Sequence, residues 1–206
     1  MSTLAKICGL VSAEDAAFAA GQGADLLGFV SHPPSPRHCE DLSVAYPYLD
    51  QAVLVQVAEC AEAILATAHR HGFRRVQPYL PAVSREAGVH LLRDAGLQVL
   101  LPWPDEPDQA SVAADLYVWE ASPQVTGVVG GSGQGHAMAH PPPGPFLLAG
   151  GLDAANLRER VQGLSASQRG DFLGVDAASR LEASPGVKDP AKVSAFIHAA
   201  YDLEHP

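Results

Sequence analysis

The chain has few cysteines and few positive charges, and each shortage excludes a class of protein. Its three cysteines, Cys8, Cys39 and Cys60, are an odd number without C-x-x-C spacing. We therefore expect neither a disulfide framework nor a structural zinc site, and a reducing, cytoplasmic location. Lys and Arg number 13 against 23 Asp and Glu, for a net charge of -10. Nucleic-acid binding needs clustered cations, so we expect no nucleic-acid partner.

Long apolar runs are missing as well. No run approaches the roughly 18 residues that a membrane span needs. The first residues lack the basic and apolar stretches of a signal peptide, so we expect no membrane partner. The composition is otherwise globular, because 47% of the 206 residues are hydrophobic and only 17% are charged. Together these values predict one domain over residues 1–206 with a well-buried core.

Short aliphatic runs alternate with helical patterns along the whole chain. Runs such as "LLGFV" and "AVLVQV" are almost continuously apolar, as parallel strands buried on both faces are. The predicted strands are Ala5–Ile7, Leu26–Val30, Ala52–Val57, Arg75–Gln77, Leu97–Leu101, Leu116–Trp119, Phe146–Ala149 and Phe172–Val175. The predicted helices are 16–22 after a capping Ser12, Cys60–His71, Ser84–Ala95 with a capping Ser84, Ala154–Val161 and Pro190–Ala200.

This alternation predicts an α/β fold with a parallel sheet. Eight strands suit a single-domain (β/α)8 TIM barrel, although 206 residues are few for that fold. The alternative is an open doubly wound sheet. The G-x-G-x-x-G fingerprint that follows the first strand of many such sheets is absent here.

Paired glycines follow the seventh predicted strand, in "LLAGGLDAANL". Backbone N–H groups at Gly150 and Gly151 can approach an anion, and barrels often hold a phosphate between the loops after strands seven and eight. The alternative is that the two glycines only make a tight turn. A second glycine-rich stretch, "VVGGSGQG" at Val128–Gly135, lacks the ending of a phosphate loop and predicts a lid or a turn beside the substrate.

Three side chains stand at the carboxyl ends of strands, the face where barrels of this kind carry their chemistry. Cys8 ends the first strand, as a small buried filler or as a thiol at the mouth of a site, and the local sequence leaves both readings open. Glu120 and Asp176 end the sixth and eighth strands. They either face the barrel mouth, or they cap a helix or pair with Arg37 or Arg180.

Histidines gather in the two long loops after the second and sixth strands: His32, His38, His136 and His140. With Cys8 and Cys39 they offer the donor types of a metal site. His136 and His140 straddle a loop that runs into three prolines, however, and do not share a helix face. We expect solvated histidines and no metal.

Six stretches taken in order resemble the phosphoribosylanthranilate isomerase family, (β/α)8 enzymes of tryptophan biosynthesis. They are "KICGL", "GADLLGFV", "PPSPR", "GGSGQ", "FLLAGGLDAANL" and "PGVKDPAKVSAFI". The resemblance covers nearly the whole chain, and "KICG" with "PGVKD" is a specific combination. It implies an Amadori rearrangement of an N-(5′-phosphoribosyl) aromatic amine. It also implies a phosphorylated small-molecule substrate, no cofactor, and a monomer or homodimer.

The resemblance also implies roles for single residues. Cys8 would be the general base, a role that at neutral pH needs surroundings that depress its pKa, and Glu120 would be the general acid. Arg37 would bind the carboxylate of the anthranilate group by a charge-assisted pair. The other substrate-binding residues would be Tyr79 and Asp176, and the phosphate-binding residues Gly150, Gly151, Ser179 and Arg180.

The chain departs from the family pattern at several of these positions. Glu120 stands where the family has aspartate, and Tyr79 where V-Q-L-H-G has histidine, with Pro78 entering that strand. The asparagine after the third strand is missing, and Ala178-Ser179-Arg180 replaces S-S-G. The alternative function is therefore a barrel paralogue that binds another phosphorylated or carboxylated ligand, with altered or no catalysis. A metal-dependent lyase or hydrolase is the third class.

Overall fold

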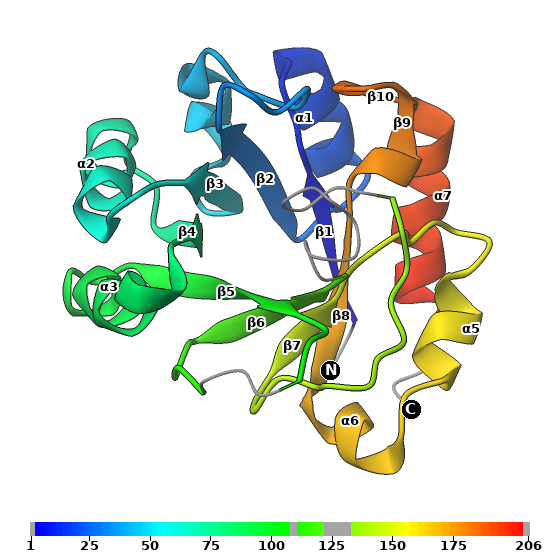
Figure 1. Ribbon diagram of the computed structural model, residues 1–206. Helices are drawn as coiled ribbons and strands as arrows, with labels where there is room; N and C mark the ends of the chain where they lie inside the picture. The colour runs from blue at the N-terminus through cyan, green and yellow to red at the C-terminus, as the bar shows by residue number, and fades with distance from the viewer. Residues whose placement is uncertain (1–2, 108–110, 122–132, 204–206) are drawn as a thin grey trace.

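Eight parallel strands close into a barrel in the computed structural model of the protein, which describes residues 3–107, 111–121 and 133–203. The order around the barrel follows the chain from β1 to β8, with β8 pairing back onto β1 (Figure 1). The strands are β1 Leu4–Cys8, β2 Leu26–Ser31, β3 Ala52–Val57, β4 Arg75–Tyr79, β5 Gln98–Pro104, β6 Leu116–Glu120, β7 Phe146–Leu148 and β8 Phe172–Ala177. The predicted barrel and its eight strands are confirmed, and the open doubly wound sheet is excluded.

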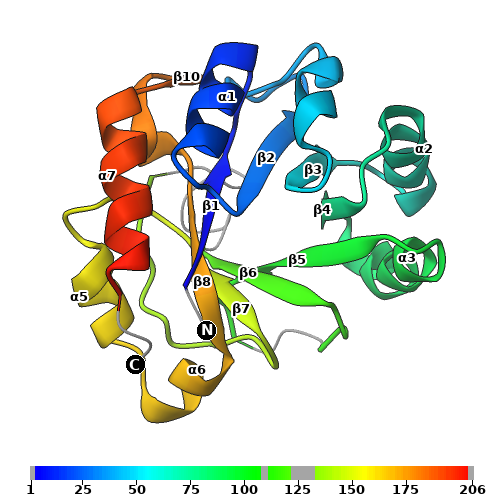
Figure 2. The same ribbon diagram turned by 180° about the vertical axis from the view of Figure 1, so that it is seen from behind.

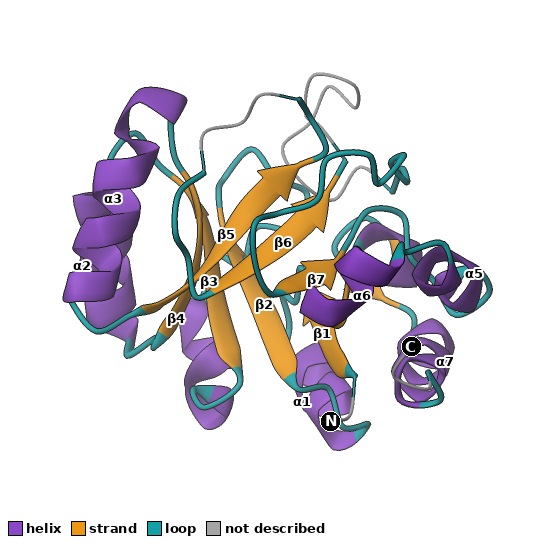
Figure 3. Cartoon of the chain, turned by 90° about the horizontal axis from the view of Figure 1, so that it is seen from below, coloured by secondary structure: helices purple, strands orange, loops and turns teal. Residues whose placement is uncertain are grey.

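Helices lie around the outside of the strands. The α-helices are α1 Ala13–Gly21, α2 Ala61–His71, α3 Ala82–Asp94, α5 Leu157–Gln162, α6 Ala166–Asp171 and α7 Pro190–Tyr201. Two 3₁₀ helices, η1 Leu42–Tyr48 and η2 Ser179–Leu181, and a small hairpin of β9 Glu182–Ser184 with β10 Val187–Lys188 complete the set. Helices α1 and α7 lie side by side (Figures 1 and 2), and α2 packs with α3 on the far side from α5 and α7 (Figure 3). Within the described ranges, no helix has the length and apolar character of a membrane span.

Two predicted helix starts were wrong. Helix α3 begins at Ala82 rather than behind a capping Ser84, because Pro81 precedes it with a φ of -55° that already suits a first turn. Helix α5 begins at Leu157 rather than Ala154. The side chain of Asp153 accepts the N–H groups of the two residues that follow Ala154, and this turn displaces the helix start.

Helix α6 was not predicted, although its sequence contains a recognised start signal. The hydroxyl of Ser165 accepts the backbone N–H of Gln168, and the Gln168 side chain accepts the N–H of Ser165. This reciprocal pair is a capping box, which stabilises the first turn of even a short helix. The Ser-x-x-Gln spacing therefore predicts the helix without any tertiary information.

The strand–helix alternation is interrupted after β5 and β6. The described parts of residues 105–115 and 133–145 contain no helix, and Asp105 instead fastens the second segment by accepting the N–H groups of Ala139 and His140. The side chain of His136 is buried there, between Asp105 and the carbonyl of Ala149. The prediction that all four loop histidines are solvated was therefore wrong for His136.

Strand side chains alternate between the barrel interior and the layer beneath the helices. The interior cluster is small and mostly aliphatic, whereas the outer layer carries large groups such as Phe29 and Trp119. The interior also buries one complete ion pair, between Lys6 of β1 and its register partner Asp176 of β8. Charge inside a barrel is costly unless it is paired, and this pair lies directly below the functional end.

The ladder between β4 and β5 has the fewest paired residues of the barrel. Only two register pairs join these strands, Arg75 with Gln98 and Val76 with Val99. Beyond them Pro78 of β4 and Pro102 of β5 have no N–H to donate, so the ladder ends early. An apolar cavity opens at this point, and Glu120 is one of its lining residues.

Candidate active site

The carboxyl ends of the strands surround a cavity that contains five of the predicted site residues. They come from β1, the loop after β2, β4, β6 and β8, and are Cys8, Arg37, Tyr79, Glu120 and Asp176. A second cavity contains the predicted phosphate-binding residues Gly150, Gly151, Ser179 and Arg180. Glu120 and Asp176 line both cavities, so one elongated ligand can reach from one to the other.

Glu120 is the best-defined acid of the site. Its side chain is only 7% exposed, and the hydroxyl of Tyr79 donates to both carboxyl oxygens, at 3.0 Å and 3.1 Å. Burial raises the pKa of Glu120 to about 8, with a further increase from Asp176, while the Tyr79 hydrogen bond and Lys6 oppose the shift. At neutral pH Glu120 is therefore mostly a neutral carboxylic acid that has a proton to donate.

Cys8 lies on the inner face of β1, with its thiol at the floor of the first cavity. The thiol fits because residue 28 is glycine: a Cβ there would lie 2.8 Å from the sulfur. Burial raises the pKa of Cys8 above its ordinary value, as does Asp176, while Lys6 and Lys188 lower it without reversing the shift. The depression of this pKa that a base at neutral pH needs is therefore not found, because the cost of burying a thiolate exceeds the benefit of two cations.

Lys6 is the cation nearest to this chemistry, and the sequence reasoning missed it. It is fully buried, and its ammonium donates to Asp176 at 2.9 Å. Burial alone would lower the pKa of Lys6, but the negative charges of Asp176 and Cys8 raise it, so the ammonium stays charged. A lysine between apolar neighbours in "LAKIC" is the signal that marks it, because alternation along β1 turns Lys6 and Cys8 to the same inner face.

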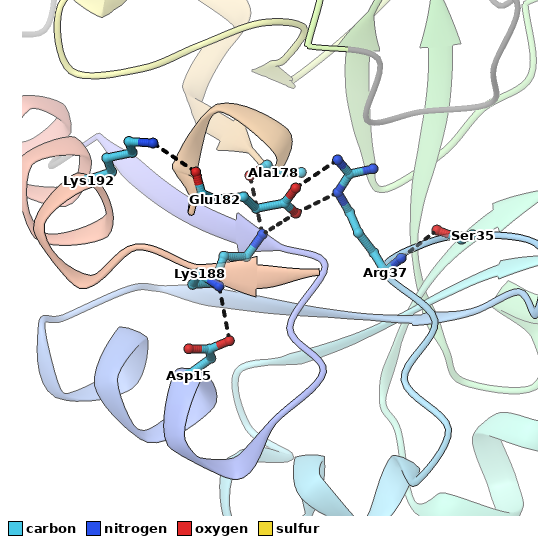
Figure 4. Close-up of polar contacts among 7 residues, drawn as sticks. All are labelled: Asp15, Ser35, Arg37, Ala178, Glu182, Lys188 and Lys192. Atoms are coloured by element: carbon cyan, nitrogen blue, oxygen red, sulfur yellow. Dashed lines mark hydrogen bonds and ion pairs between the residues drawn. The ribbon is translucent and has the colours of Figure 1, made fainter. Parts of the chain in front are cut away.

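Arg37 reaches the site from the loop after β2 and is held by Glu182 (Figure 4). Its Nε and Nη2 donate to the two carboxyl oxygens of Glu182 at 2.6 Å and 2.9 Å. Lys188 donates to the same carboxylate at 3.1 Å, from a buried position. The side chain of Arg37 fits against Gly9, where a Cβ would lie 2.6 Å from its Cδ. Its remaining nitrogen, Nη1, has no hydrogen bond within the described part of the chain, and Arg37 is one of the residues that line the cavity.

The ion pairs differ from those that the sequence offered as alternatives. Asp176 pairs with Lys6 rather than with Arg37 or Arg180. Arg180 pairs with Asp153 at 2.9 Å and also donates to the carbonyl of Gly133, so its side chain is directed to the rim of the second cavity. The cavity therefore stays open beside Ser179.

Both the backbone conformation and the close approach of neighbouring backbone atoms require the paired glycines. Gly150 and Gly151 have φ values of 86° and 63°, which side chains disfavour. A Cβ on Gly151 would also lie 2.7 Å from the carbonyl oxygen of Gly133 and 2.8 Å from the nitrogen of Gly135. Two glycine-rich segments thus meet face to face over the second cavity. The rest of the stretch Val128–Gly135, up to residue 132, lies outside the described residues.

Across residues 3–107, 111–121 and 133–203, no three or more His, Cys, Asp or Glu side chains gather so that they can share an ion. His32 and His38 contact each other within the loop after β2, whereas His136 is far along the chain beside Asp105.

Comparison with known proteins agrees with this geometry. The family model described as N-(5'phosphoribosyl)anthranilate (PRA) isomerase matches residues 5–199. The chain belongs to that isomerase family. A relative from Maridesulfovibrio salexigens, named N-(5'-phosphoribosyl)anthranilate isomerase, is 34% identical, with 97% of this chain and 98% of the relative covered. Among solved structures, TrpF from Jonesia denitrificans has a TM-score of 0.76 at 28% identity, with 97% of each chain covered.

A further isomerase of the family was solved with reduced 1-(o-carboxyphenylamino)-1-deoxyribulose 5-phosphate. It covers 98% of this chain and all of its own, with a TM-score of 0.69 at 23% identity, which shows a common fold. Membership in the isomerase family had been predicted from motif order and is confirmed. The motifs did not reveal Gln77, Glu182 and Lys188 as parts of the site, although "VQ" and "PGVKD" contain two of them.

Proposed function

We propose that this protein isomerises N-(5'-phosphoribosyl)anthranilate by an Amadori rearrangement in tryptophan biosynthesis. One observation carries the proposal: Glu120, a carboxylic acid kept neutral by burial, lines the same cavity as the Cys8 thiol. The reaction needs one group that gives a proton and another that takes one, both facing the same sugar. Membership in the isomerase family supports the same reaction.

The proposed chemistry begins at the furanose oxygen. Glu120 donates its proton to that oxygen as the C1′–O bond breaks, and the amine lone pair forms the C1′=N bond of a protonated Schiff base. Cys8, whose raised pKa makes the thiolate its minor form, then reacts as that thiolate and removes the proton from C2′. The C–H electrons form C1′=C2′ and neutralise the nitrogen, and the resulting enolamine tautomerises to the 1-deoxyketose.

The remaining residues bind the ends of the substrate. Backbone N–H groups at Gly150 and Gly151, with Ser179 and Arg180, are proposed to hold the phosphate. The free Nη1 of Arg37 is proposed to pair with the anthranilate carboxylate, while Glu182 fixes the arginine in place. Asp176 accepts a sugar hydroxyl, and Tyr79 borders the substrate from β4.

Glu120 provides the decisive test. Purified protein is assayed with phosphoribosylanthranilate by following the anthranilate fluorescence, with wild type, Glu120→Gln and Glu120→Asp in parallel. We expect Glu120→Gln to lower turnover at least about 10²-fold. We expect Glu120→Asp to lose activity as well, because Tyr79 is placed to contact the longer side chain and a shift of about 1 Å is costly.

The outcomes separate the two candidate functions. Rescue of a tryptophan auxotroph that lacks this isomerase, with loss of rescue by Glu120→Gln, supports the proposal. A wild-type protein that binds inorganic phosphate but neither rescues the auxotroph nor turns over the substrate would instead identify a paralogue for another phosphorylated or carboxylated ligand.

We further propose that the protein acts in the cytoplasm, as a monomer or homodimer, without a nucleic-acid partner. Three free cysteines support the first point. The net charge of -10 supports the last.

A further inference from the structure

A chain of hydrogen bonds runs through the wall of the first cavity and ends on Glu120. The side-chain nitrogen Nε2 of Gln77 donates to the hydroxyl of Tyr79 at 3.1 Å. That hydroxyl donates to both carboxyl oxygens of Glu120. Gln77 and Tyr79 lie two residues apart on the same inner face of β4, and Glu120 ends β6. The three groups therefore connect β4 with β6, on either side of β5, where the β4–β5 ladder is short.

The direction of this chain decides where the acid proton points. The Tyr79 oxygen accepts from Gln77, and the single phenol proton is directed at Glu120. A neutral Glu120 has a proton of its own as well. With Tyr79 acting as donor, the proton of Glu120 is left for another acceptor, and Glu120 is one of the residues that line the cavity containing Cys8.

The other end of the chain has an unsatisfied acceptor. Gln77 is only 2% exposed, and its Oε1 is buried without a hydrogen-bond partner among the described residues. An unmade hydrogen bond at a buried amide oxygen is costly. Because Gln77 also lines the cavity, a ligand with a hydroxyl or N–H group can supply the missing donor.

We propose that Gln77 and Tyr79 are positioning residues that turn the proton of Glu120 toward the substrate, and that Oε1 of Gln77 accepts a hydrogen bond from a hydroxyl or the amine N–H of that substrate. The inference rests on the proposed function, in which Glu120 is the acid. It adds that the substrate must supply a hydrogen-bond donor to Gln77. It also adds that Gln77 and Tyr79, both on β4, orient the acid Glu120.

Several other charged or titratable groups face the same carboxyl. Asp176 from β8 and Lys6 from β1 act on Glu120 by charge, and Cys8 from β1 acts on Tyr79. Within the described ranges, the hydrogen bonds to the carboxyl oxygens of Glu120 come from Tyr79. Removing this hydroxyl therefore isolates its contribution while Asp176, Lys6 and Cys8 stay in place.

The test is a titration of Glu120 in the free protein. The 13C signal of its side-chain carboxyl is assigned with Glu120→Gln and followed against pH in wild type and in Tyr79→Phe. We expect the pKa of Glu120 to rise by about one unit in Tyr79→Phe, because a donor to the charged form is lost. We also expect kcat to fall about 10-fold or more, as the acid loses its orientation.

The sign of the shift tests the proposed direction. If Glu120 instead donates to Tyr79, the hydroxyl stabilises the neutral acid, and Tyr79→Phe will lower the pKa. A fall, or no change, overturns the proposal. Tyr117→Phe is the matched control, since Tyr117 is also buried and donates to the carbonyl of Val112. It should reduce stability without moving the pKa of Glu120.

Gln77→Met tests the outer end of the chain. We expect KM for the substrate to rise about 10-fold, the equivalent of one lost hydrogen bond. The double variant with Tyr79→Phe should show the same Glu120 pKa as Tyr79→Phe alone, because Gln77 acts through Tyr79. An unchanged KM, or additive pKa shifts, contradicts the proposal. The titrations need no substrate turnover, so they report on the chain of hydrogen bonds even if the proposed reaction fails.

Discussion

The two cavities that share Glu120 differ in what lines them, mainly backbone in one and buried side chains in the other. The cavity that we propose binds the phosphate, called the phosphate cavity below, is formed largely by main chain. Gly150 and Gly151 have positive φ there, and Arg180, which lines it, is 46% exposed at the side chain. The acid–base cavity is formed by buried side chains whose pKa values are shifted, among them Glu120, Cys8 and Tyr79. In the proposed function, one cavity would recognise a ligand through backbone groups, and the other would set the protonation of the acid and the base by excluding water.

This difference teaches which changes each cavity tolerates. Backbone N–H donors do not depend on the identity of neighbouring side chains, so Arg180 can replace a glycine of the family pattern and turn to Asp153 at the rim. A buried carboxyl has no such freedom. A longer acid at position 120 comes with a tyrosine that contacts both of its oxygens. Substitutions should therefore separate into those that alter protonation and those that alter ligand affinity.

The largest expected effect breaks the acid–base cavity alone. Cys8→Ser should lower kcat roughly 10³-fold, because a serine hydroxyl is a far weaker acid than a thiol and supplies almost no base. The affinity for inorganic phosphate, measured by calorimetric titration, should be unchanged. Wild-type turnover in a folded Cys8→Ser protein would remove Cys8 from the reaction.

The next effect is on stability and depends on pH. Because the pKa of Glu120 in the folded protein is about 8 against an ordinary 4.5, its contribution is fully present below pH 4.5. It is lost as pH rises through 8, since the unfolded chain releases the proton first. Between pH 5 and pH 8, Glu120→Gln should therefore gain about 2 to 4 kcal/mol in unfolding free energy relative to wild type. Urea denaturation at both pH values measures this, and parallel pH profiles would contradict the buried-acid assignment.

A smaller effect breaks the phosphate cavity. Gly151→Ala places a Cβ against Gly133 and Gly135 and should raise KM roughly 10-fold, the equivalent of one lost hydrogen bond to the phosphate. Gly96→Ala is the matched control, because Gly96 has a φ of 82° with no atom near its Cβ position. Gly96→Ala should lose about 1 to 2 kcal/mol of stability from its positive φ. Gly151→Ala should lose more, because its Cβ also meets backbone atoms, and only Gly151→Ala should change KM. Equal KM values would show that the phosphate lies elsewhere.

The smallest effect sharpens the comparison. Arg180→Met should change KM only about threefold and leave kcat unaltered, since an exposed ion pair contributes little and the main chain supplies most of the donors. Steady-state kinetics at low and high salt measure both values. A drop in kcat would indicate that Arg180 takes part in the acid–base cavity.

The fold was largely predictable from the sequence, and the reason lies in periodicity. Nearly continuous apolar runs such as Ala52–Val57 identify buried parallel strands before any contact is known. Glycine signals were equally local, because Gly96 and Gly150 both adopt the positive φ that their places after a helix and a strand suggested. A helix start was predicted wrongly where two residues could each begin the helix, as Pro81 and Ser84 can for α3.

The site was predictable only in its membership. Motif order assembled Cys8, Glu120 and Gly151 around two cavities that share a wall. The protonation of the site could not be read from motifs, because it depends on how far each group is removed from water. The raised pKa of Cys8 and the orientation of Glu120 by Tyr79 both arise from neighbours that are distant in the sequence.

The short β4–β5 ladder has a consequence for association between molecules. If the barrel opens during unfolding, it does so where the fewest hydrogen bonds must break, and the newly exposed edges belong to β4 and β5. An unpaired edge usually recruits a strand from another chain and seeds aggregation. Here Pro78 on one edge and Pro102 on the other interrupt the row of donors that such pairing needs. If the β4–β5 ladder opens, the two strand edges that it exposes are therefore poor templates for aggregation.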